Sequence, residues 1–208
     1  MLKEAGWISQ AGMHSARNLS LIAIFSSLTI ATDYALAPAL NVKLMDTLVF
    51  SSAYAFGFRI GASIAILSEL VWGLVSPYGF FLPIIPFLVV GELLYATAGH
   101  LASRIWGMEK LSTISPRNLF FGAILAICAF VWDFETNIAT GLLALWPREN
   151  LAGVLFFEVT GIPFMIPHEL SDFILGATLA PVIIVYSRRL VMKGYSSTKM
   201  ALAQSEVR

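Results

Sequence analysis

Four acidic residues, Glu69, Glu92, Asp133 and Asp172, lie inside or at the ends of long apolar stretches. A charged side chain in hydrocarbon costs at least about 2.5–3.5 kcal/mol, so such residues usually face a bundle interior or a water-filled cavity. Carboxylates gathered in one cavity can neutralise or hydrogen-bond a cationic or amine-bearing ligand. The four acids are therefore the first candidates for a binding site.

Helical spacing adds aromatic and polar partners to these acids. Residues three or four apart share one helix face, which places Trp72 beside Glu69 and Tyr95 beside Glu92. Aromatic rings on such faces can stack on a ligand ring or hold a cation, which contributes roughly 0.5–2 kcal/mol. The candidate substrate-binding residues are Glu69, Trp72, Glu92, Tyr95, Asp133, Asn137, His168, Glu169 and Asp172.

Catalytic motifs give little support to an enzyme. His168-Glu169-Leu170-Ser171-Asp172 begins like the HExxH motif of zinc proteases, but Asp stands where the second His is needed. The sequence contains neither GxSxG nor a phosphate-binding Walker A loop. We therefore expect no catalytic residues, no cofactor and no metal. An intramembrane metal-dependent enzyme using His168, Glu169 and Asp172 stays open as an alternative.

The composition is that of an integral membrane protein. The chain is 58% apolar and only 12% charged, with a mean hydropathy of +0.79, whereas soluble domains carry about 25% charged residues. The formal net charge is zero, so nothing suggests a nucleic-acid partner. We predict one membrane domain over residues 1–208, in an all-α fold.

Six stretches are candidates for transmembrane helices, which need roughly 20 mostly apolar residues. The second of these stretches is short. The segment 144–167 is interrupted by prolines, which predicts an irregular outer loop between helices five and six. Two further spans in that stretch are the alternative. Residues 1–18 are expected to form an interfacial segment, 19–190 the six-helix bundle, and 191–208 a cytoplasmic tail. The predicted spans are 19–38, 45–58, 60–76, 81–106, 117–143 and 168–190.

Six spans place both termini on one side of the membrane. All of the 13 Lys and Arg residues except Lys43 and Arg148 then fall on that side. Basic residues concentrate in cytoplasmic segments, so both termini are predicted to be cytoplasmic. With this orientation the four acids lie between the membrane midplane and the outer face, which predicts a polar cavity open to the outside.

Six segments carry motifs that can be compared with known families. They are Leu40–Asp46, Gly57–Ala62, Trp72–Gly79, Gly91-Glu92, Asp133–Asn137 and Gly161–Asp172. These segments resemble the substrate-binding S components of energy-coupling factor (ECF) transporters. The resemblance runs through roughly residues 19–190 and agrees with six spans and cytoplasmic termini.

The resemblance implies a subunit of a prokaryotic cell-membrane importer that captures a vitamin or similar micronutrient. A transmembrane T component and two ATPases would be its partners. Small residues on the first helix commonly contact the T component in this family, and helices approach closely at small residues in lipid. The candidates here are Ala23, Ser27, Ala31 and Ala35. The surplus of acids favours a cationic, thiamine-like ligand, and a solitary secondary transporter is the remaining alternative.

Overall fold

The chain folds into an all-helical bundle. The computed structural model describes residues 2–206 apart from 78, 80 and 108–110, with side chains described from 16 to 191. No strand occurs within that part of the chain. The elements are α1 (Leu2–Leu36), α2 (Met45–Phe56), α3 (Phe58–Val75), the 3-10 turn η1 (Leu82–Ile84), α4 (Ile85–Trp106), α5 (Asn118–Ala144) and α6 (Leu151–Glu206).

Within the described residues, five of the helices are long and apolar enough to cross a membrane, so the chain is a multi-pass membrane protein. The helix at the second predicted span, α2, has only 12 residues. At about 1.5 Å per residue it is about 18 Å long, shorter than the roughly 30 Å hydrocarbon core. The five candidate spans are Ala16–Leu36, Phe58–Val75, Leu82–Trp106, Asn118–Ala144 and Leu151–Val191.

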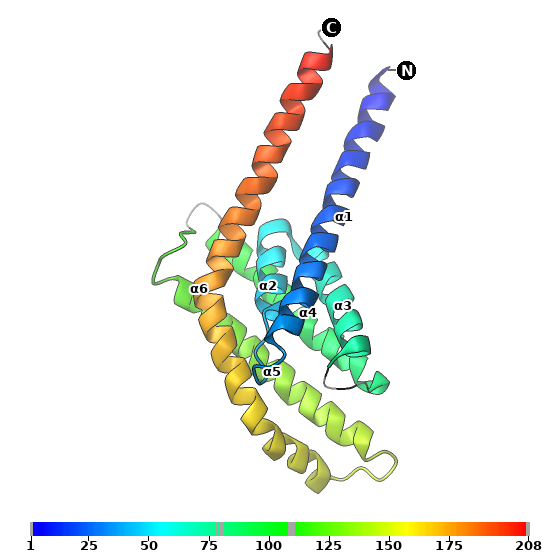
Figure 1. The fold of residues 1–208 in the computed structure, drawn as a ribbon, viewed down its shortest axis with the longest axis vertical. Helices are drawn as coiled ribbons and strands as arrows, with labels where there is room; N and C mark the ends of the chain where they lie inside the picture. The colour runs from blue at the N-terminus through cyan, green and yellow to red at the C-terminus, as the bar shows by residue number, and fades with distance from the viewer. Residues whose placement is uncertain (1, 78, 80, 108–110, 207–208) are drawn as a thin grey trace.

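Helix α2 lies at the centre of the bundle (Figure 1). Every residue from Met45 to Tyr54 is buried, and the helix contacts α1, α3, α4, α5 and α6. A helix that is buried all round is shielded from lipid by protein. Its length therefore need not match the thickness of the bilayer, because its ends meet protein rather than hydrocarbon.

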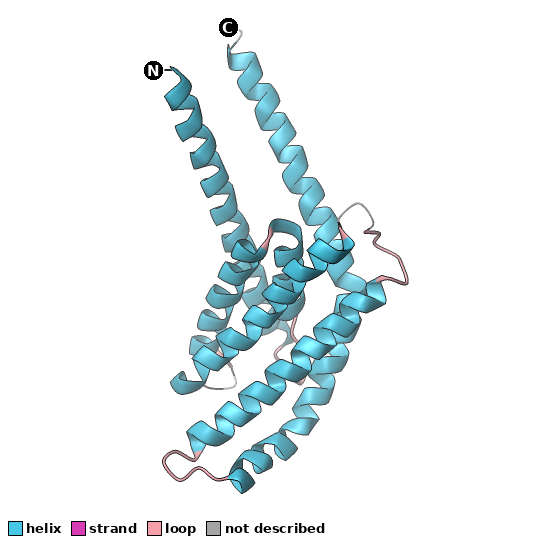
Figure 2. Ribbon diagram, turned by 180° about the vertical axis from the view of Figure 1, so that it is seen from behind, coloured by secondary structure: helices cyan, strands magenta, loops and turns pink. Residues whose placement is uncertain are grey.

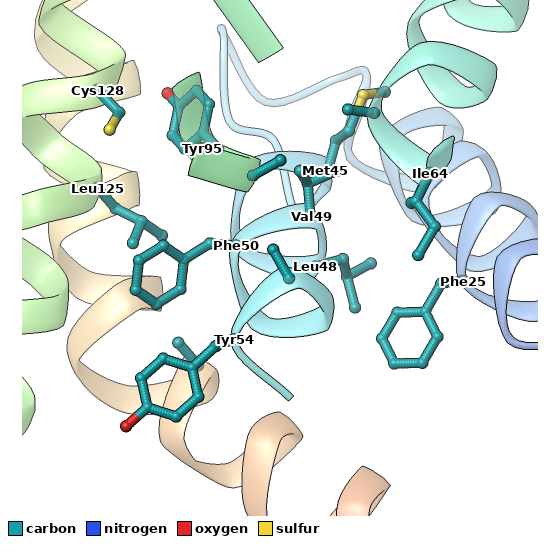
Figure 3. Close-up of a cluster of buried hydrophobic side chains, with 14 of the residues drawn as sticks. Phe25, Met45, Leu48, Val49, Phe50, Tyr54, Ile64, Tyr95, Leu125 and Cys128 are labelled. Atoms are coloured by element: carbon teal, nitrogen blue, oxygen red, sulfur yellow. The ribbon is translucent and has the colours of Figure 1, made fainter. Parts of the chain in front are cut away.

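Glycines let two neighbours approach α2 closely. A Cβ atom at Gly61 of α3 would lie 2.4 Å from the Cβ of Ala53, and one at Gly99 of α4 would lie 2.2 Å from the Phe50 carbonyl oxygen. Below these contacts, Phe50 and Tyr54 pack edge-on against Phe121 of α5. Figure 3 shows these α2 side chains in the apolar core, with Tyr95 at its upper edge.

The predicted irregular loop at 144–167 is wrong for most of its length. Helix α6 begins at Leu151 and continues through Pro163 and Pro167, so only residues 145–150 connect it to α5. Proline removes one backbone hydrogen bond, which a transmembrane helix tolerates when neighbouring groups compensate. Asn150 caps the helix start, since its Oδ1 accepts the Gly153 amide at 2.8 Å. Figure 2 shows the resulting α5–α6 hairpin.

The two chain termini lie at the same end of the bundle, where α1 and α6 project beyond the other helices (Figure 1). Helix α1 is continuous from Leu2, so residues 2–18 of the predicted interfacial segment belong to the same helix as the first span. Helix α6 likewise continues through the predicted tail to Glu206. The connection between α5 and α6, residues 145–150, lies at the opposite end (Figure 1).

Candidate functional site

His168 of α6 joins three helices through its two ring nitrogens. Its Nδ1 lies 2.9 Å from Oδ2 of Asp133 on α5, and its Nε2 lies 3.0 Å from Oδ2 of Asp46 on α2. All three side chains are buried. A doubly protonated imidazole donates to both carboxylates, and such charge-assisted bonds are about twice as strong as neutral ones. His168 is thus the centre of a buried ionic network.

Asp33 of α1 fixes the start of α2 and with it the position of Asp46. Its Oδ1 accepts the backbone amides of Leu44 at 3.1 Å and Met45 at 3.2 Å. Carboxylates are favoured at a helix N-terminus because they satisfy free amides and complement the positive end of the helix dipole. Asp46 follows in the first turn, so this cap sets where its carboxylate meets His168.

Tyr95 and Asp172 link α4 to α6 beside this network. The Tyr95 hydroxyl donates to Oδ2 of Asp172 at 2.9 Å, and neither residue is exposed. The other carboxylate oxygen of Asp172 has no hydrogen-bond partner. Asp172 lies four residues after His168, so the two side chains share one face of α6.

Glu69 of α3 and Glu92 of α4 complete the acidic side of the cluster. Both are fully buried, and none of their four carboxylate oxygens has a well-directed hydrogen-bond partner. Each interacts electrostatically with Asp46. Buried polar groups are normally hydrogen-bonded. The oxygens of these two buried acids are therefore free to accept a hydrogen bond from a ligand.

Lys43 brings a cation into the same cluster from the loop between α1 and α2. Its Nζ lies 3.6 Å from the centroid of the Trp132 ring on α5. Burial alone would lower the pKa of Lys43, but the surrounding carboxylates, Asp46 foremost and then Glu69, raise it above its ordinary value. Lys43 is therefore charged, and its position shows that the Trp132 face can hold an ammonium group.

The cluster has more acids than bases. Six buried carboxyl groups face two basic side chains, and burial of unpaired charge is costly. An added cation would reduce this imbalance, whereas an added anion would increase it. The acids are Asp33, Asp46, Glu69, Glu92, Asp133 and Asp172, and the bases are Lys43 and His168.

The remaining predicted binding residues lie at or beyond the edge of the cluster. Trp72 is buried on α3 with its ring 5.4 Å from that of Tyr34. Asn137 lies one turn beyond Asp133 and donates to Sδ of Met165 at 3.6 Å. Glu169 is only partly buried, next to His168 on α6. The structure thus brings Glu69, Glu92, Tyr95, Asp133, His168 and Asp172 together and leaves Asn137 and Glu169 outside.

The predicted contact residues for a T component form one stripe on α1. Ala23, Ser27, Ala31 and Ala35 recur every four residues, and all four are exposed on the outer face of the helix. The opposite face of α1 carries buried Phe25, which packs against the bundle. The stripe is accordingly available to another helix in the membrane.

Sequence reasoning missed Asp33, Lys43, Asp46 and Trp132 as members of the site. Lys43 and Asp46 flank the start of α2, and an acid immediately before an apolar run is a helix-start signal that could have been used. Trp132 precedes Asp133 and faces His168 edge-on with ring centroids 5.5 Å apart. Tryptophan is enriched at membrane interfaces, but this one is buried in the bundle.

Chemically, the cluster can hold a cation. Its carboxylates lie beside the Trp132 ring, whose face the Lys43 ammonium occupies. One atom each of Asp46, His168 and Asp172 lies within 4.8 Å of the other two. Carboxylate oxygen and imidazole nitrogen also ligate metal ions. Comparison of the chain with protein-family models, curated proteins and solved structures found no match.

Proposed function

We propose that this chain is the substrate-binding subunit of a membrane importer and captures a small cationic or amine-bearing micronutrient. The observation that carries the proposal is the buried surplus of carboxyl groups around Lys43, His168 and Trp132. Enclosed carboxylates suit an organic cation, and a cation that replaced Lys43 at the Trp132 face would gain a cation–π contact of roughly 0.5–2 kcal/mol. A thiamine-like molecule, with a charged ring and an amine, has the right chemistry.

The orientation that we propose has six passes through the membrane, with α2 as a shielded half-length pass and both termini in the cytoplasm. Both termini lie at one end of the bundle, and the basic residues concentrate there. Such a distribution favours the cytoplasmic side of a prokaryotic plasma membrane. The opposite end would then face the outside.

The depth of the cluster supports uptake from the outer side. Glu69 lies six residues before the end of α3 at Val75, and Glu92 lies seven residues after the start of α4 at Ile85. At about 1.5 Å per residue these positions are about 9–11 Å from the ends of α3 and α4 that lie away from the termini. A ligand entering there would cross a shorter distance than one entering from the cytoplasm.

The partners that we propose are a transmembrane T component and two ATPases, as in the ECF transporters that the sequence resembles. The exposed small residues of α1 offer a face on which a second helix can pack closely. Co-purification of an ATPase and a second membrane protein with the tagged chain would support this assembly. Uptake by the chain alone in liposomes would instead favour a solitary transporter.

A ligand screen tests the proposal. The purified chain is heated in detergent with a panel of cationic, neutral and anionic vitamins, and the shift in thermal unfolding is measured. We expect a cationic member to raise the unfolding temperature, and Glu69→Gln and Glu92→Gln to weaken its binding at least tenfold. Glu149→Gln, at an exposed loop position, is the matched control. Tight binding of an anionic vitamin, unchanged in both site variants, would sink the proposal.

A further inference from the structure

Asp46, His168 and Asp172 form a three-ligand set of the kind that binds a metal ion. One oxygen or nitrogen atom of each lies within 4.8 Å of the other two, and all three side chains are buried. Nε2 of His168 and Oδ2 of Asp46 are 3.0 Å apart. Ligand atoms about 2.0–2.2 Å from one ion are roughly 3–4 Å from each other, so a small contraction would bring this set into coordination range.

The second nitrogen of His168 is already held as in known metal sites. A metal-bound His almost always gives its other ring N–H to a carboxylate or carbonyl, which fixes the tautomer and the ring orientation. Here Asp133 accepts from Nδ1 at 2.9 Å. The Trp132 ring packs edge-on against the imidazole. These two contacts hold the imidazole ring so that Nε2 points at Asp46.

Carboxylate oxygens without a hydrogen-bond partner on two buried acids supply an independent sign of a ligand. Oδ1 of Asp172 has no hydrogen-bond partner, although the residue is fully buried. Glu92 lies next to Asp46, is fully buried, and has no well-directed partner on either oxygen. Lys43 faces the same acids and opposes a second cation, but the six buried carboxyls still outnumber it.

We infer that a divalent transition-metal ion binds between α2 and α6, coordinated by Asp46, His168 and Asp172, and that it replaces the proton on Nε2 of His168, which is released to water. Asp133 positions His168, and Glu92 offers a further oxygen. One imidazole with two carboxylates suits zinc, manganese, iron or cobalt better than calcium or magnesium, which favour oxygen ligands alone. The inference goes beyond the proposed function, because ion binding requires neither an organic solute nor an energising module.

Metal analysis of the purified full-length chain tests the inference. The protein is stripped with a chelator in detergent, equilibrated with zinc and freed of unbound ion, and bound zinc is measured by mass spectrometry. We expect one zinc per chain and at least a tenfold loss of affinity in Asp172→Asn. Glu169→Gln, on the same helix but outside the ligand set, should bind like the wild type. Cobalt in place of zinc should give visible absorption bands that Asp172→Asn alters.

Folding of the variants is checked by size-exclusion chromatography and thermal unfolding, and His168→Gln provides a second site variant if Asp172→Asn is unstable. Absence of stoichiometric zinc in the wild type would overturn the inference, as would wild-type affinity in whichever site variant folds. The proposed function is tested separately from the metal site. Vitamin binding without zinc would leave it standing, whereas zinc binding without any organic cation would support the metal site alone.

Discussion

Replacing His168 by Ala should destabilise the protein strongly, because one side chain holds two buried carboxylates. The substitution removes the bonds at 2.9 Å to Asp133 and 3.0 Å to Asp46. Hydrogen bonds to charged groups contribute about 1.5–3 kcal/mol each. The expected loss is about 3–6 kcal/mol, which agrees with the roughly 3–5 kcal/mol measured when one partner of a buried ion pair is deleted.

The assay is unfolding in mixed micelles, read as the free energy of unfolding and as the unfolding temperature. For a chain of this size 1 kcal/mol corresponds to about 2–4 °C, so His168→Ala should lower the unfolding temperature by at least about 6 °C. Glu169→Ala, at the adjacent and only partly buried position, should change the free energy by less than about 0.5 kcal/mol. Equal stability of the two variants would refute the reasoning that His168 ties α2 to α5.

Substitutions at three further positions probe the surroundings of the cluster. Asp33→Ala removes the cap of α2 and should cost about 0.5–2 kcal/mol in thermal unfolding, whereas Asp33→Asn keeps an acceptor and should cost less; equal losses would argue against the cap. Gly99→Ala places a Cβ 2.2 Å from the Phe50 carbonyl oxygen and should cost about 1–3 kcal/mol in detergent unfolding, and a neutral result would mean that α2 and α4 pack more loosely. The raised pKa of Lys43 means that its charge contributes stability fully below the ordinary lysine pKa and loses it as pH rises through the higher folded value. Lys43→Met should therefore show less alkaline destabilisation than the wild type, and identical pH profiles would contradict that assignment.

The long helices could be predicted from the sequence because apolar length is a local property. The predicted spans 60–76, 81–106 and 117–143 differ from the observed helices by only one or two residues for the most part. The start of α6 was missed because Pro163 and Pro167 were taken to break the helix. Asn150 indicates a helix that starts directly after it, since asparagine is a preferred N-cap residue.

The site could be predicted only in part. Glu69, Glu92, His168 and Asp172 stand out because a polar residue in an apolar helix is visible in the sequence alone, and spacing orders them along the membrane normal. Lys43 and Asp46 could not be found this way. Their positions depend on how the loop 37–44 folds back into the bundle. That path is set by Asp33 of α1, whose carboxylate caps the start of α2. That contact joins residues of different helices, and spacing within one helix does not reveal it.

The most direct test of the central claim is a calorimetric titration of the purified chain with a cationic vitamin such as thiamine, beside the same titration of Glu92→Gln. The claim is that the buried acids between α2, α4 and α6 bind a cation. Saturable binding with one site per wild-type chain, weakened at least tenfold in Glu92→Gln, is the predicted result. Equal affinity of the two proteins, or binding of an anionic vitamin in place of the cationic one, would contradict the account.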